Sequence, residues 1–189
     1  MSKNILAMDT SAAHCAVGLF WDGEIVFDDT RAMPTGQAEA LQPLIKDALG
    51  ARDINGLDIL CVGIGPGSFT GTRIGVSTAR GLALSLGIPA IGVSNFELSY
   101  HPDDAPTSRH VRELPGPGET KYQQTFDGLV AVSPPVHMDG TVQDHKLVDI
   151  PRRLIAYGCI KEPRERPAPL YVRAPDAALP SAPAPTLLS

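Results

Sequence analysis

The first thirty residues alternate short apolar runs with turn residues, a pattern typical of β-strands. Strand-like runs occupy residues 4–10, 14–21 and 24–31. Asp22 and Gly23 separate the second run from the third, and an Asp-Gly pair between two strands is a strong signal for a two-residue hairpin. The sequence therefore begins with three predicted antiparallel strands.

Helical spacing of apolar positions appears next. It predicts helices over residues 37–49 and 72–87, because apolar residues three or four positions apart share one face of a helix. Gly50 is suited to end the first helix. Pro43 either kinks that helix or marks its true start, since a proline in a helix interior costs about 3 kcal/mol.

Two continuous apolar runs, residues 58–65 and 89–94, predict buried strands. Ser94 and Glu97 have the spacing of a capping box that opens a further short helix. The resulting order, βββαβαβα, is that of a ribonuclease-H-like domain, the unit duplicated in the actin-like ATPase superfamily. We therefore expect an α/β protein whose residues 1-101 form a complete N-terminal lobe of this fold.

The chain changes character near residue 102. Of its 18 glycines 13 lie in residues 1–101, whereas 14 of its 18 prolines lie in residues 102–189. Residues 102-162 are expected to form a reduced second lobe, and residues 163-189 a Pro/Ala-rich tail that folds back through Leu170, Tyr171 and Val172. The strands expected in the second lobe cover residues 110–114, 120–126 and 129–133, with a turn at 115–118.

Charge and composition narrow the class of protein. The 189 residues carry a formal net charge of −5, which argues against a protein that binds nucleic acid or an anionic membrane without a partner. The three cysteines, Cys15, Cys61 and Cys159, show no CxxC spacing and are interpreted as reduced thiols of a soluble, cytoplasmic protein. The N-terminal apolar run is too short for a signal peptide, so no processing is expected.

The stretch "GIGPGSFTGTRIG", residues 63–75, is the strongest candidate for a binding site. Pro66-Gly67 fits a type II turn, and Ser68, Thr70 and Thr72 stand where a helix begins and its free N–H groups attract anions. The spacing matches neither a P-loop nor a dinucleotide fingerprint. A phosphate cradle and a purely structural strand-to-helix corner both remain open on these residues.

An actin-like ATPase needs further phosphate contacts. Asp9, Thr10 and Ser11 follow the first predicted strand and would face the same cleft, although they equally suit a turn in which the side chains bond local backbone. The second half lacks a glycine-rich adenosine loop, and its weak candidate hairpin is Asp139-Gly140-Thr141. We therefore expect at most a vestigial phosphate site, formed by Asp9, Thr10, Ser11, Ser68 and Thr70, with no cofactor beyond weak or partner-dependent ATP or ADP.

Other catalytic and metal chemistry finds little support. "HMDG", residues 137–140, lacks the second histidine that a shared metal would need on a helix, and is interpreted as a solvated loop. No nucleophile elbow or Cys-His arrangement is visible. No metal site and no catalytic residue are predicted.

The helix predicted over residues 72–87 is apolar on most sides, so we expect most of its surface to be buried against other parts of the protein or a partner. Its small residues recur every four positions, which favours close packing of a second helix. We expect a partner subunit on this face with helix 37–49 alongside; the alternative is that the second lobe covers it. The residues expected at the interface are Leu41, Ile45, Gly71, Ile74, Gly75, Thr78, Ala79, Leu82, Ala83 and Leu86.

Three strings together resemble one family. "ILAMDTS" (5–11), "GPGSFTGTRIGVSTARGLALSLGIPAIGVS" (65–94) and "PLYVRAPDAALP" (169–180) are similar to the TsaB (YeaZ) family, which takes part in the threonylcarbamoyladenosine modification of tRNA. The resemblance implies a noncatalytic, cytoplasmic, actin-like subunit that dimerises with and activates TsaD, the catalyst that carries the metal. It also implies cooperation with the ATPase TsaE, a homodimer when alone, and contact with tRNA only through these partners.

Two segments depart from the family's usual pattern. The first predicted helix begins Gln37-Ala38-Glu39 where the family shows His-Ser-Glu, and "RELPGPGET" (112–120) replaces an Asp-Ala-Arg-Arg segment. Two other functions therefore stay open: an autonomous ATP-dependent enzyme that uses Asp9 for metal and Ser68 to Thr72 for phosphate, and a homodimeric binding protein for another partner.

Overall fold

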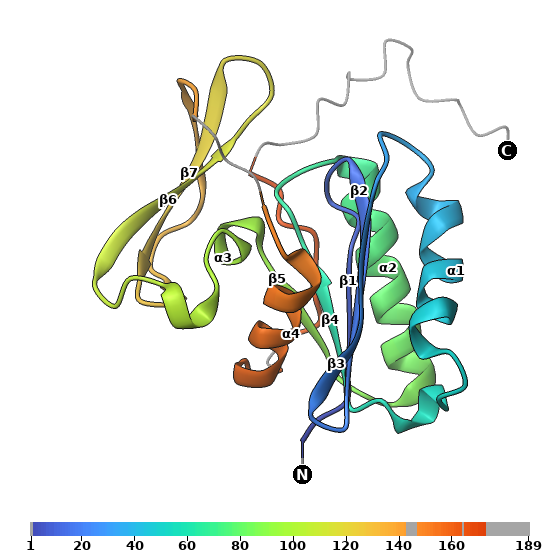
Figure 1. The fold of residues 1–189 in the computed structure, drawn as a ribbon. Helices are drawn as coiled ribbons and strands as arrows, with labels where there is room; N and C mark the ends of the chain where they lie inside the picture. Colours follow the sequence, from blue (N-terminus) through green and yellow to red (C-terminus); the bar gives the residue numbers. More distant parts are fainter. Residues whose placement is uncertain (1, 143–146, 164, 173–189) are drawn as a thin grey trace, which may run out of the picture.

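A computed structural model describes residues 2–142, 147–163 and 165–172. It consists of a five-stranded sheet with helices on both faces and a smaller second sheet beside it (Figure 1). Within the described ranges, none of the helices combines the length and the apolar character that crossing a bilayer requires.

The first sheet has the order β3-β2-β1-β4-β5. Its strands are β1 (Ile5–Asp9), β2 (His14–Trp21), β3 (Glu24–Ala32), β4 (Ile59–Gly63) and β5 (Ala90–Val93). The first three pair antiparallel and the last two add parallel to β1. Asp22 and Gly23 both take positive φ, 52° and 92°, as a type I′ hairpin turn requires. The predicted hairpin is confirmed.

Two long helices cover one face of this sheet (Figure 1). They are α1 (Gln37–Leu49) and α2 (Phe69–Leu86), and the short α3 (Asn95–Leu98) follows β5 behind the predicted capping box. Helix α1 runs through Pro43, so a start at Pro43 is wrong. Helix α2 begins three residues before the predicted start, because the Ser68 side chain caps it by accepting the Gly71 N–H.

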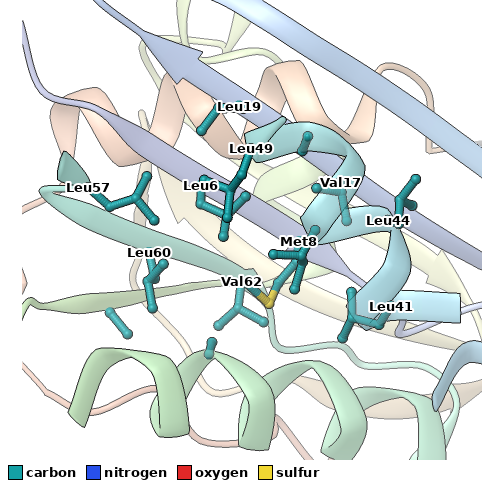
Figure 2. Close-up of a cluster of buried hydrophobic side chains, with 14 of the residues drawn as sticks. Leu6, Met8, Val17, Leu19, Leu41, Leu44, Leu49, Leu57, Leu60 and Val62 are labelled. Carbon is teal, nitrogen blue, oxygen red and sulfur yellow. The ribbon is translucent and has the colours of Figure 1, made fainter. Parts of the chain in front are cut away.

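The order βββαβαβα is therefore confirmed, and the fold is that of the actin-like, ribonuclease-H-like class. Side chains alternate across β1 because successive residues of a strand point to opposite faces. Leu6 and Met8 enter the core under α1 and α2, shown in Figure 2, whereas Ile5 and Ala7 enter the core on the other face. Burial on both faces explains why the strands appear as continuous apolar runs.

Helix α4 (Ile150–Ile160) covers the other face of the first sheet. Sequence analysis assigned these residues to the second lobe and predicted no helix there. They instead return to the first lobe and bury Leu154, Ile155 and Tyr157 against the sheet. Arg153 Nη1 donates to Leu98 O at 2.6 Å and the Tyr157 hydroxyl donates to Glu97 O at 2.9 Å, so α4 is also bonded to the end of α3.

The second sheet is antiparallel and centred on β7. It contains β6 (Arg109–Pro115), β7 (Thr120–Asp127), β8 (Val130–Ala131) and β9 (Val136–Asp139). The two longer predicted strands are confirmed, and the third is reduced to two residues. The expectation of a loop at 137–140 is wrong, because three of these residues belong to the exposed strand β9. Two short 3-10 turns, Ile54–Gly56 and Pro102–Asp104, complete the fold.

A buried arginine joins the second sheet to α3. Arg112 on β6 is 2 % exposed, and its guanidinium donates to Phe96 O at 3.0 Å, Glu97 O at 3.3 Å and Gly128 O at 3.2 Å. The guanidinium carbon also lies 4.0 Å from the centre of the Phe126 ring. A buried charge is tolerated here because several carbonyl groups and aromatic faces replace its water shell.

Replacing this arginine tests how firmly the two sheets are joined. We expect Arg112→Met to lower the free energy of unfolding by about 3 kcal/mol, since it leaves several buried carbonyl groups without donors. Arg112→Lys restores the charge but not the planar fork and should recover only part of the loss. Urea denaturation measures both. Arg109→Met, at an exposed position of the same strand, is the control. An equal loss of unfolding free energy in that variant would contradict the role of Arg112 in joining the second sheet to α3.

Candidate functional site

The predicted phosphate residues meet at one edge of the first sheet. Strands β1 and β4 are parallel neighbours, so Asp9 at the end of β1 and the loop that follows Gly63 lie side by side. This edge, at the carboxyl ends of parallel strands, is where α/β sheets commonly bind ligands. The structure therefore brings Asp9, Thr10 and Ser11 beside Ser68. Thr70 instead lies exposed on the first turn of α2.

The polar groups of the β1 turn are bonded within the protein. Asp9 is fully buried. Its Oδ1 accepts from the Ser11 N–H at 2.8 Å, and its Oδ2 lies 2.8 Å from His14 Nε2. The Thr10 hydroxyl donates to Gly71 O at 2.7 Å. These contacts are those of a turn that bonds its own backbone, and they leave Asp9 turned toward His14.

The β4–α2 loop is held to the same turn. The Ser68 N–H donates to Ser11 O at 2.6 Å. Asn95 Nδ2 donates to the Ser11 hydroxyl at 3.1 Å and to Pro66 O at 2.8 Å. Sequence analysis missed Asn95; its only signal was its place directly after Ser94, where the capping box begins.

Glycines make this contact possible. A Cβ at Gly67 would overlap Ser11 O, and one at Gly71 would overlap Thr10 O. The space beside these glycines is thus filled by the protein's own backbone, which is the structural corner that the sequence left open as an alternative. The predicted type II turn is wrong: the Gly65–Pro66 peptide is cis, and the positive φ, 84°, belongs to Gly65.

Much of the predicted interface lies inside the first lobe. Five of its residues are buried in the structure: Leu41, Ile45, Gly71, Gly75 and Ala79. Gly71 and Gly75 face Thr10, and Ala79 is fully buried in the core beneath α2. Their place at an interface is therefore corrected, because the small-residue stripe lets α2 approach its own sheet. Ile74, Thr78, Leu82, Ala83 and Leu86 are partly exposed.

The C-terminal segment packs on the same edge of the sheet. The Leu170 N–H donates to Ile64 O at 2.8 Å, and Leu170 and Val172 pack against the cluster of Phe96, Leu114 and Phe126. The prediction that the tail folds back through residues 170–172 is confirmed. The rest of the tail, residues 173–189, lies outside the described residues.

Tyr171 joins this segment to α2. Its hydroxyl accepts from Arg73 Nε at 2.8 Å, and its ring centre lies 5.3 Å from that of Phe69. The Arg73 guanidinium carbon lies 3.6 Å from the centre of the Phe69 ring, a cation–π distance. Sequence analysis missed this cluster because it joins residues almost one hundred positions apart.

The cysteines add no reactive group to this edge. All three are free, and Cys15 and Cys61 are buried. Burial raises the pKa of Cys15 to about 11 and that of Cys61 to about 12, so both remain neutral thiols near pH 7. Among residues with described positions, no three His, Cys, Asp or Glu side chains gather as metal ligands would.

Comparison with known proteins places this arrangement in a family. The model of TsaD, tRNA N6-adenosine threonylcarbamoyltransferase, matches residues 36–106. The tRNA threonylcarbamoyladenosine biosynthesis protein TsaB of Escherichia coli is 40% identical over 94 residues, which are 49% of this chain and 40% of that protein. These matches support the TsaB (YeaZ) family for the N-terminal half of this chain. The chain spans about two fifths of the length of the first curated TsaB relatives that it matches.

Longer matches, at lower identity, extend beyond the N-terminal half of the chain. An uncharacterised protein of Mycobacterium tuberculosis is 29% identical over 206 aligned positions and covers 93% of the chain and 94% of its own length. The solved structure of YeaZ from Pseudomonas aeruginosa superposes with a TM-score of 0.63 at 24% identity, over 76% of this chain and 72% of that one.

A second solved structure, of an uncharacterised protein with similarity to peptidase YeaZ from Pseudomonas aeruginosa, gives a TM-score of 0.71 at 19% identity. It covers 91% of this chain and all of that one. Both structural matches support the same fold for this chain.

Two glycines of α2 provide a matched test of the structural corner. Gly71→Ala should lower the free energy of unfolding by roughly 2–4 kcal/mol, because the new Cβ meets the Thr10 backbone. Gly81→Ala has open space around its Cβ and should raise stability by about 0.5–1 kcal/mol through helix propensity. Thermal or urea unfolding compares them. Similar effects in the two variants would show that the contact at Gly71 is not tight.

Proposed function

We propose that this chain is a noncatalytic subunit that pairs with a TsaD-like tRNA threonylcarbamoyladenosine transferase and activates it, together with a TsaE-like ATPase. The printed names of its TsaB relatives, all tRNA threonylcarbamoyladenosine biosynthesis proteins, support the pathway. Because the chain spans only part of the length of those relatives, its activity and its partners are proposed here.

The observation that carries the noncatalytic role is the filled phosphate cradle. Asp9 bonds to the Ser11 N–H and to His14, Thr10 bonds to Gly71, and Ser11 bonds to Asn95. A phosphate or metal at this edge would have to break these bonds and separate two backbone segments that are in contact. This rearrangement would cost free energy and would therefore lower the affinity for the phosphate or metal.

The match to the TsaD model supports the mode of pairing. Residues 36–106 include α1 and α2, so a TsaD-like protein carries a segment related to these helices. Two related subunits can pair through equivalent helical faces, and a homodimer of this chain alone would use the same face. The partly exposed residues Ile74, Thr78, Leu82, Ala83 and Leu86 belong to it.

The isolated chain should bind Mg-ATP weakly or not at all. Titration calorimetry of the purified protein with Mg-ATP is expected to give no saturable one-to-one heat at micromolar concentrations, since the cradle is occupied by the protein's own atoms. The same titration on the complex with the TsaD-like subunit tests whether a nucleotide contact is completed by the partner. Tight one-to-one binding by the isolated chain would instead favour an autonomous ATP-dependent enzyme.

Co-expression with the TsaD-like protein of the same organism tests the subunit role directly. We expect co-elution in size exclusion and a large gain in threonylcarbamoyladenosine on tRNA when this chain is added to the TsaD-like and TsaE-like proteins. Separate elution and unchanged modification without this chain would remove the proposal.

A further inference from the structure

Strand β6 lies at an edge of the second sheet. Among the strands that the structure describes, it pairs with β7 alone, whereas β7 continues to β8 and β9 on its other side. The unpaired side of such a strand presents a row of N–H and C=O groups, which another strand can bind. The residues along this outer edge therefore determine which strand fits.

The register shows which backbone groups of β6 point outward. Thr125 on β7 uses both of its backbone groups on the side of β8: its carbonyl accepts from the Val132 N–H at 2.9 Å, and its N–H donates to the Ser133 hydroxyl at 3.0 Å. Val111 lies directly opposite Thr125. Opposed residues of an antiparallel pair either exchange both backbone bonds or bond away from each other. The N–H and C=O of Val111 therefore face the outer edge.

Three residues of β6 share this orientation. Arg109 and Glu113 lie two positions before and after Val111, so their backbone groups face the same way and their side chains lie on the same face of the sheet. Arg112, between them, points to the opposite face, where it is buried. Val111 is 46 % exposed, and Arg109 is exposed as well. The outer edge thus presents a positive, an apolar and a negative side chain in that order.

This order is complementary to itself. When a second copy of β6 lies antiparallel to the first with Val111 opposite Val111, Arg109 of each copy lies opposite Glu113 of the other. Each of these three positions exchanges two backbone bonds, about six in all, and opposite charges directly across two strands attract. Glu113 binds Lys121 through Oε1 at 2.6 Å, so its Oε2 can accept from the arginine of the other copy.

Charges and a proline at a sheet edge often prevent pairing, and here they limit it. Pro115 has no N–H, so the row of donors ends there and the contact stays short. Like charges would repel a second copy, but Arg109 and Glu113 have opposite signs at equal distances from Val111. The charges therefore select one register instead of blocking all of them.

We infer that β6 binds β6 of a second copy of this chain, so that two second sheets join into one continuous antiparallel sheet. A strand of another protein would satisfy the backbone groups, whereas a second copy satisfies the charges as well. The contact is closed, because it uses the same edge of both copies. In Figure 1 the second sheet stands on the side of the first sheet away from α1 and α2, so the contact does not involve these helices. The inference goes beyond the proposed function, which requires no second copy.

Exchange of the two charges tests this register. Sedimentation velocity of the purified chain, over about 1–200 μM, is compared for the wild type, Arg109→Glu, Glu113→Arg and the variant with both changes. We expect the wild type to form a dimer and each single change to weaken it by at least about tenfold, because like charges then lie opposite each other. The double change places opposite charges across the contact again and should restore the dissociation constant to within about threefold of the wild type.

Two further variants separate this contact from one through α2. Val111→Pro removes the central N–H of the outer edge, which makes no bond to β7, and should abolish the dimer. Arg80→Glu is the matched control, because it makes the same charge change at an exposed position of α2 and should leave the dimer unchanged. Loss of the dimer in Arg80→Glu but not in Arg109→Glu would place the contact on α2 and overturn the inference.

A wild type that stays monomeric, a dimer that survives both single changes, or a double variant as weak as the single ones would overturn it as well. The proposed function is judged separately, by co-elution with the TsaD-like subunit, which all the β6 variants should retain.

Discussion

The contact between two backbone segments, Thr10–Ser11 and the loop at Gly67–Gly71, determines most of this structure. It requires residues without a Cβ, because a side chain at Gly67 or Gly71 would meet a carbonyl oxygen. It fixes where α2 begins, since Ser68 bonds to Ser11 and caps the helix. The same contact bonds the Thr10 hydroxyl to Gly71 O and the Ser68 N–H to Ser11 O, so in the structure this motif joins the ends of two strands.

Helix α2 consequently has two faces with different tasks. The small-residue face lies against the sheet and over Thr10, where close approach is needed. The opposite side of α2, where Phe69, Arg80 and Leu84 are exposed, is bordered by the C-terminal segment. One periodic pattern in the sequence therefore describes both an internal packing surface and, on the opposite side, an exposed one.

The first lobe could be predicted because its turns and helix caps are determined by residues close together in the sequence, such as Asp22-Gly23 and Ser94 with Glu97. Helix α4 escaped prediction because no side chain caps its start and Asp149 takes a left-handed conformation there; packing on the sheet stabilises it. The meeting of Asp9 and Ser68 followed from parallel strand ends. Spacing could not reveal that their groups bond within the protein, nor which side of α2 the glycines face.

The second sheet is an insertion in the first lobe, because its strands lie between α3 and α4 in the sequence and both of these helices belong to the first lobe. Hydrogen bonds join α4 to α3. Leu98, where the chain leaves, accepts from Arg153, soon after the chain returns, and Tyr157 bonds to Glu97 beside it. The ends of the inserted segment are thus held together by the parent lobe, whatever lies between them. Evolution can shorten or lengthen such an insertion at little cost in loop entropy, which gives a physical reason why a small second lobe can accompany a complete first one.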